Sequence, residues 1–239
     1  MVGERSNGVP ADSAAEFGER LQELKSRGCA VLVVGAVPSN IHVGLCHRML
    51  GERATPPRQR LLVFTNGTVA LDSGIPTSGP TAANGANGGR GGETHVITTA
   101  TARTTATRAV ADWDIPVVDL VDPSLADLGL AISEVFEDIE KRHGPPEPAQ
   151  VRFCLDSLSP LLDAHDEAAV FEFLVLVTRY VRSMNGMGHF HLPLPRQAYA
   201  ARLVAPLFDA LVELRVGVDE PEHRWYLQED GFTSQWLPL

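Results

Sequence analysis

Lysine is scarce in this chain of 239 residues: only Lys25 and Lys141 are lysines, and the remaining basic residues are arginines. There are 30 acidic residues against 20 basic ones, which gives a net charge of −10. Because a negative surface repels phosphate backbones, we do not expect nucleic-acid binding that is independent of sequence. An acid excess with little lysine is also typical of a high-salt cytoplasm, where charges are screened. We therefore interpret the acidity as a sign of a halophilic habitat.

Long apolar runs are also lacking. No stretch reaches the length of a membrane span, and the first twenty residues contain no apolar segment of the kind found in signal peptides. The sequence therefore predicts a cytoplasmic protein without membrane contact.

Cysteine is the third scarce residue. Cys29, Cys46 and Cys154 are far apart in the sequence and show no CxxC spacing. This spacing predicts neither a disulfide framework nor a cysteine zinc site.

The composition fits one globular domain, because 44% of the residues are hydrophobic and 239 residues suffice for a single sizeable core. Residues 1–13 are polar and are expected to form a disordered tail, so that the domain spans 14–239. Within it, residues 73–93 contain seven glycines and almost no large apolar side chain, which predicts a flexible surface loop.

Strand and helix patterns alternate along the domain. Short apolar runs bounded by turn residues are typical of parallel strands buried on both faces, and apolar residues spaced three and four apart indicate helices. Two late segments alternate apolar and polar residues, as an antiparallel hairpin does. The expected strands are 29–35, 61–64, 95–99, 115–120, 151–155, 189–192, 211–216 and 224–227, and the expected helices are 14–27, 41–50, 101–112, 124–143 and 166–183.

This order predicts an α/β fold whose central sheet is mostly parallel and ends in a C-terminal antiparallel hairpin. Ser124 and Asp127 have the spacing of a helix N-cap. The helix 166–183 has only a narrow polar strip, so we expect it to be buried nearly all round.

The loop after the first strand is the first candidate site, because ligands of open α/β sheets lie at the carboxyl ends of strands. Residues 35–42 have the position and length of a phosphate-binding loop, GxxxxGK[ST]. Gly35 fits the first glycine. Asn40 replaces the second glycine, Ile41 the lysine, and His42 the hydroxyl residue that ligates magnesium. Ser39 remains as a polar residue of the loop.

The second candidate is Asp156, which follows the apolar run 151–155. An acidic residue at the end of such a strand has the Walker B layout, in which the carboxylate reaches magnesium. The alternative is structural, since Asp156 and Ser157 are also suited to leaving a strand through a turn.

The stretch 151–162, the helix that follows it, the segment Met187–Leu192 and the segment 207–215 together resemble the RecA/KaiC-like ATPase superfamily. More narrowly, the chain resembles a branch of that superfamily from halophilic archaea, over roughly residues 15–239. The resemblance implies a RecA-like three-layer sandwich, with an ATP site between residues 35–42 and Asp156.

The same resemblance implies acidic residues after the second strand that activate the attacking water. Residues 65–68 stand there and include no carboxylate. The lysine, the hydroxyl ligand and the general base are thus all missing, and phosphoryl transfer depends on such positioning and charge. We therefore expect a pseudo-ATPase without catalytic residues or cofactor, which retains Gly35, Ser39, Asn40, Ile41, His42, Asp156 and Ser157 as a vestigial nucleotide site. The alternative is an ATPase that binds ATP and magnesium through an unorthodox loop at 35–42 with Asp156.

A metal site is a third hypothesis. His189 and His191 are two residues apart on one strand, so their side chains share a face and could bind a metal. Asp156 could join them if its strand is adjacent, but the sequence shows no definite third ligand. A hydrogen-bonded histidine pair is the alternative.

A regulatory or scaffold protein would act through a protein partner or by self-association. The apolar helix 166–183 and the terminal segments 224–227 and 235–237 are the candidate surfaces, unless they belong to the core. The arginines at 53, 58 and 60 form the densest basic cluster, which a solvated loop would explain.

Overall fold

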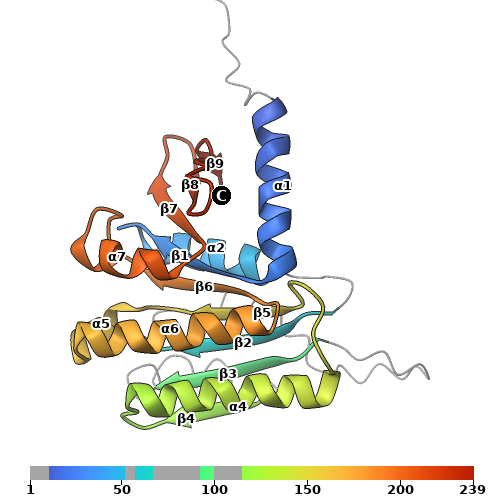
Figure 1. Cartoon of the computed structure of the whole chain (residues 1–239). Helices are drawn as coiled ribbons and strands as arrows, with labels where there is room; N and C mark the ends of the chain where they lie inside the picture. Colours follow the sequence, from blue (N-terminus) through green and yellow to red (C-terminus); the bar gives the residue numbers. More distant parts are fainter. Residues whose placement is uncertain (1–10, 52–56, 67–91, 100–114) are drawn as a thin grey trace, which may run out of the picture.

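The computed structural model describes residues 11–51, 57–66, 92–99 and 115–239. These residues form an α/β fold in three layers, with a mostly parallel sheet between helices (Figure 1), which confirms the predicted fold class. The strands are β1 (Cys29–Val34), β2 (Gln59–Phe64), β3 (Thr94–Thr99), β4 (Val117–Leu120), β5 (Val151–Leu155), β6 (Met187–Leu192), β7 (Ala210–Val216), β8 (Pro221–Leu227) and β9 (Leu237–Pro238). The helices are α1 (Ala11–Arg27), α2 (Ser39–Leu50), α4 (Leu125–His143), α5 (Ser159–Ala164), α6 (Glu167–Ser183), α7 (Tyr199–Val204) and the 3-10 turn η2 (Ala205–Leu207).

The strands of the described residues follow the order β4-β3-β2-β5-β6-β1-β7-β8-β9. The pairs from β4 to β7 are parallel, whereas β8 runs antiparallel to β7 and β9 antiparallel to β8. The predicted C-terminal hairpin is therefore confirmed. β1 and β5 are separated by β6 alone, so the ends of these three strands meet at one edge of the sheet.

The central strands are buried on both faces, as their continuous apolar runs predict. In β1, alternate residues face opposite layers. Leu32 packs into the larger core cluster with α4 and α6, while Val31 and Val33 pack into a smaller one with α1 and α2. Figure 1 shows α4 and α6 lying side by side across one face of the sheet, and these two helices contact each other.

Local capping sets several helix ends. Ser124 caps α4 in a capping box with Asp127, as predicted. Gly28 ends α1 with φ +76°. Helix α1 begins at Ala11, so residues 11–13 are helical and do not belong to a disordered tail. The rest of that expected tail, most of the loop 73–93 and the expected helix 101–112 lie outside the described residues.

The expectation that 166–183 is buried nearly all round is wrong. Only one face of α6 is buried, through Val170, Phe173, Leu174, Val177, Thr178 and Val181. Val175 is 43% exposed and Leu176 44% exposed. The helix contacts β1, β6 and α4, while Val175 and Leu176 remain partly exposed.

Arg58 and Arg60 do not lie in a solvated loop. Arg60 is in β2 and is 2% exposed, and its Nη2 donates to the carbonyl of Gly51 at 2.6 Å. Arg58 donates to the carbonyl of Leu50 at 3.2 Å. The two arginines satisfy carbonyl groups at the end of α2, which helices leave unpaired. Arg53 lies outside the described residues.

The terminal aromatic residues pack within the chain, so the expected sticky surfaces at 224–227 and 235–237 are not free. Trp225 is in the smaller core cluster. The guanidinium groups of Arg215 and Arg224 lie over the Trp236 ring, at 3.9 and 4.5 Å from its centroid. Among the described residues, no helix combines the length and the apolarity needed to cross a bilayer.

Candidate functional site

A cavity of about 190 Å³ lies where the loop after β1 faces the carboxyl ends of β5 and β6. This is the edge at which α/β sheets bind ligands. The cavity lining contains no lysine or arginine among the described residues. It consists of Val37, Ser39, His42, Val43, Cys46, Asn66, Cys154, Asp156, Ser157, His191 and Pro193.

Gly35 is the one residue that fits the phosphate-loop pattern. Close packing and hydrogen bonds within the chain account for its position. A Cβ added to it would lie 2.6 Å from the carbonyl oxygen of Leu214, and its φ is +146°. Its N–H donates to Leu194 and its carbonyl accepts from His42 Nε2 at 2.9 Å. The close approach of β7 thus explains this glycine without a phosphate.

The other loop residues separate into two groups. Ile41 is 6% exposed, packs into the smaller core cluster and does not line the cavity. Ser39 and Asn40 are exposed at the start of α2, and Ser39 lines the cavity. His42 also lines it, but both of its ring nitrogens already have partners, namely Gly35 and His191.

Asp156 lies at the end of β5, as predicted, and its carboxylate holds the loop after β2. Oδ1 accepts from the Thr65 N–H at 2.7 Å and from Thr65 Oγ1 at 2.9 Å, and Oδ2 faces the Asn66 N–H at 3.4 Å. Thr65 Oγ1 also lies 2.5 Å from the carbonyl of Ser157. Burial raises the pKa of Asp156 to about 6, against the opposing effect of these hydrogen bonds.

Beside the cavity, four metal-ligating side chains meet: Cys46 from α2, Cys154 from β5, and His189 and His191 from β6. One ligating atom of each lies within 4.8 Å of the others, and all four residues are buried. Cys46 Sγ is 3.3 Å from Cys154 Sγ and 3.2 Å from His189 Nε2. The sulfur separation is far longer than a disulfide bond, and both cysteines are free.

Burial and hydrogen bonds shift the pKa values of His191, Cys46 and Cys154 in this cluster. Burial lowers the pKa of His191 to about 4, so its ring is neutral at pH 7. A hydrogen bond from the Cys154 thiol lowers the pKa of Cys46 well below its usual value, while burial raises that of Cys154. A neutral imidazole at His191 and a thiol that ionises readily at Cys46 are suited to bind a soft or borderline metal.

Half of this cluster was predicted from the sequence. His189 and His191 share a face as predicted, and Asp156 is not in the group. Cys46 and Cys154, whose spacing in the sequence predicted no cysteine metal site, lie in it. One signal was present in the sequence: Cys46 follows His42 by one helical turn. Cys154 is the direct neighbour of His189 across β5 and β6. This pairing could not be predicted without the order of the strands in the sheet.

Together these features define a three-layer α/β protein. At the carboxyl edge of its sheet lie a buried Cys/His cluster and a cavity whose described lining includes Asp156 but no lysine or arginine. The chain belongs to the family of unknown function DUF7504, which it matches over residues 28–214. That range includes the whole cavity and the cluster. No curated protein matches the chain.

Proposed function

We propose that this protein is a non-catalytic RecA/KaiC-like regulatory or scaffold protein that acts through protein partners, and that its cavity is a degraded nucleotide site. The observation that carries the proposal is the absence of any lysine or arginine from the lining described above. A nucleoside triphosphate is strongly anionic, and enzymes that transfer its γ-phosphoryl group place cations around that group. This cavity instead presents the carboxyl group of Asp156.

The neighbouring residues support the same proposal. The side chain at the lysine position, Ile41, is part of the core. The side chain at the magnesium position, His42, bonds to Gly35 and His191. The Asp156 carboxylate stabilises the turn at Thr65. The residues at the lysine, magnesium and Walker B positions are therefore replaced or already have a structural role, which supports the proposal.

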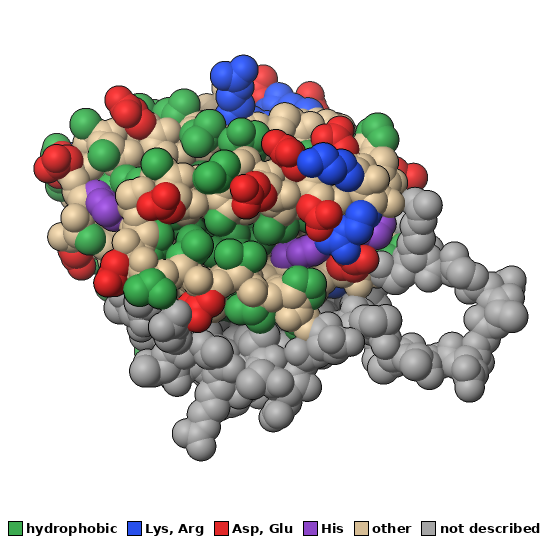
Figure 2. Space-filling model, turned by 90° about the horizontal axis from the view of Figure 1, so that it is seen from below, with side chains coloured by type: hydrophobic (Ala, Val, Ile, Leu, Met, Phe, Trp, Pro, Cys, Tyr) green, Lys and Arg blue, Asp and Glu red, His purple; other side chains and the backbone are tan. Residues whose placement is uncertain are grey.

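Protein rather than nucleic acid is the proposed partner. Figure 2 shows one face of the molecule, on which acidic side chains are spread among apolar ones and basic side chains gather toward one end. Apolar side chains are exposed on the two adjacent helices α4 and α6: Leu130 of α4 is 58% exposed, and Val175 and Leu176 of α6 are 43% and 44% exposed. Exposed apolar groups of this kind favour a protein contact.

Calorimetry of the full chain with MgATP, MgADP and MgGTP tests the loss of nucleotide binding. We expect no saturable heat and no rise in the melting temperature, because a ligand that binds only the folded state must stabilise it. The alternative function is an ATPase with an unorthodox loop at 35–42, which the position of the cavity between Ser39 and Asp156 favours. Saturable MgATP binding that Asp156→Asn abolishes would establish that alternative and overturn our proposal.

Light scattering tests the contact surface. If the exposed residues of α6 mediate self-association, Leu176→Glu should lower the measured mass, and Val218→Glu, at a fully exposed position of the β7–β8 turn, should not. A wild-type monomer in high salt would limit the proposal to a different partner protein.

A further inference from the structure

We propose that Cys46, Cys154, His189 and His191 bind one zinc ion, and that this ion is structural and fastens α2 to β5 and β6. The four residues come from three elements far apart in the chain: Cys46 is separated from Cys154 by 108 residues and from His189 by 143. The proposal does not depend on the degraded nucleotide site, since zinc and nucleotide are measured separately.

The spacing of the four groups suits a tetrahedral ion. With the usual zinc–sulfur and zinc–nitrogen distances, a tetrahedron places two sulfur ligands about 3.8 Å apart and a sulfur and a nitrogen about 3.6 Å apart. The corresponding separations here are 3.3 Å for Cys46 to Cys154 and 3.2 Å for Cys46 to His189. These two pairs would have to separate by about half an ångström, and the remaining ligand atoms lie within 4.8 Å of one another, so that small side-chain shifts would admit the ion.

The hydrogen bonds around His191 leave it with a free lone pair. The carbonyl of Gly35 can only accept, so His42 Nε2 carries the proton and His42 Nδ1 is an acceptor. His42 Nδ1 lies 3.1 Å from His191 Nδ1, which must therefore be the donor. His191 Nε2 is then unprotonated, and it is buried without a partner at hydrogen-bond geometry among the described residues, although the Cys46 thiol interacts with the His191 ring.

This relay is the arrangement that metal-binding histidines use. A histidine that ligates a metal donates its other N–H to a neighbouring acceptor, which fixes the tautomer and the orientation of the ring. Here His42 is that acceptor and Gly35 in turn orients His42.

The competing interpretation is a cluster held by hydrogen bonds alone. It pairs Cys46 with Cys154 and with His189, and thiols are weak donors. It gives the buried Nε2 of His191 no partner better than the Cys46 thiol, and a poorly satisfied buried polar group is costly. A bound ion satisfies this nitrogen and both sulfur atoms together.

The ligand set selects zinc and a structural role. Two thiolates and two imidazoles favour zinc over magnesium or calcium, which prefer oxygen ligands. Four protein ligands complete a tetrahedron, and a catalytic zinc site keeps one position open for water or substrate. All four residues are at least nine-tenths buried, as a closed structural site requires.

Elemental analysis of the full chain, purified in reducing buffer without chelator, tests the site. We expect one zinc ion per chain. Replacement by cobalt should give the visible bands of tetrahedral cobalt and a near-ultraviolet thiolate-to-cobalt charge-transfer band. Removal of the ion with a chelator should lower the melting temperature, and zinc should restore it.

Variants locate the ion. Cys154→Ser and His189→Ala should lower the zinc content well below one per chain, and Cys154→Ser should weaken the charge-transfer band. Cys29→Ser is the matched control, because Cys29 is an equally buried free cysteine outside the cluster. It should retain one zinc ion.

The wild-type chain alone can overturn the proposal, even if a variant fails to fold. A folded wild-type protein without zinc that shows no charge-transfer band with cobalt would do so. So would a purified protein without zinc whose mass is lower by two hydrogen atoms in the absence of reductant, with the disulfide mapped to Cys46 and Cys154 by peptide analysis. Zinc retained by all of the cluster variants would also contradict the assignment.

Discussion

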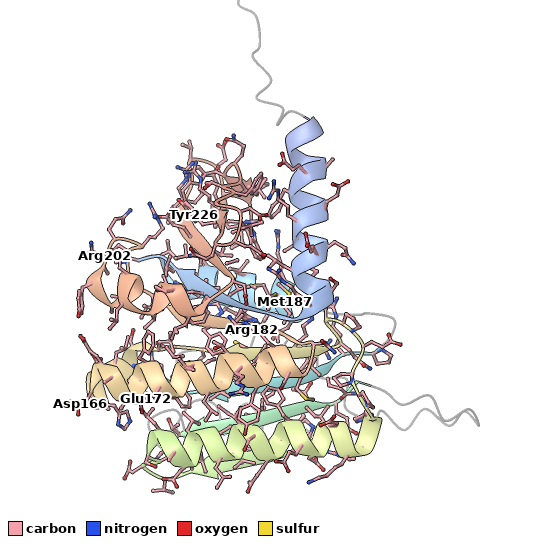
Figure 3. The ribbon with its side chains drawn as sticks, viewed as in Figure 1. Asp166, Glu172, Arg182, Met187, Arg202 and Tyr226 are labelled. Carbon is pink, nitrogen blue, oxygen red and sulfur yellow. The ribbon has the colours of Figure 1, made fainter. Side chains whose placement is uncertain are left out.

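Arg182, near the end of α6, forms an ion pair with Asp209, the residue that precedes β7, with 3.0 Å between Nε and Oδ2. The same carboxylate accepts from the Ala30 N–H at 2.8 Å, and Arg182 Nη2 donates to the carbonyl of Leu207. Figure 3 labels Arg182 toward the C-terminal end of α6. One charged pair thus joins α6, β1 and the turn before β7.

We expect Arg182→Ala to lower the free energy of unfolding by about 1–2 kcal/mol, because hydrogen bonds between charged groups are lost and Asp209 is left without its cation. The side chains of the pair are 35% and 21% exposed, so solvent screening keeps the effect below that of a fully buried pair. Urea denaturation measures it. Arg179→Ala, at an exposed position of the same helix, is the control, and an equal loss in both variants would contradict the role of the pair.

Gly35→Ala should lower the free energy of unfolding by about 3 kcal/mol, since the new Cβ would meet the Leu214 carbonyl and the backbone has positive φ. Gly18→Ala is the control, because nothing lies within 4 Å of that position in α1. It should raise stability by up to about 1 kcal/mol, as alanine favours helices. A neutral Gly35→Ala variant would mean that this glycine is not required by packing and would reopen the case for a phosphate loop.

The sequence predicted the layered α/β fold because the central strands are buried on both faces and leave a clear signal. It failed for α6, where the number of apolar residues suggested burial all round. An apolar side chain such as Leu176 is suited to burial, but the sequence does not show whether a neighbouring element covers it. The arrangement of the helices and strands decides that.

The candidate site was predictable only in part for a similar reason. Asp156 and the pair His189 and His191 were found because local spacing places them at strand ends or on one face. Cys46 and Cys154 were not, because their meeting depends on α2 packing against β5 and on β5 lying next to β6. The spacing rules for cysteine sites apply to ligands that are close in the sequence, and these are not.

The capping box of α4 should make stability depend on pH in the acid range. Hydrogen bonds from the side chain and the backbone N–H of Ser124 lower the pKa of Asp127 from its usual value of 3.8. When folding lowers the pKa of a carboxyl group, the ionised group stabilises the fold at pH values above its pKa in the unfolded state. This stabilisation is lost as the pH falls through its pKa in the folded state. Wild type should therefore exceed Asp127→Asn in stability at pH 7, and the difference should shrink at pH 3.

Denaturation of both proteins at the two pH values measures the difference. Ser124→Ala provides a second check, because removal of an N-cap costs about 1 kcal/mol at neutral pH. An equal difference between wild type and Asp127→Asn at pH 7 and pH 3 would show that the carboxylate does not act through its charge.

His42→Phe tests how the proposed zinc site is held. The variant keeps an aromatic ring at a buried position but removes the acceptor for His191 Nδ1–H. Loss of such an outer partner lowers metal affinity by about 10–100-fold, because the tautomer and the ring orientation of the ligand are no longer fixed. Competition with a chromophoric chelator measures the affinity. His165→Phe, at the end of α5 and outside the cluster, should bind zinc as wild type does. Equal affinities for wild type and His42→Phe would show that the chain from Gly35 through His42 to His191 does not orient the ligand, and zinc would then have to be held by the four ligands alone.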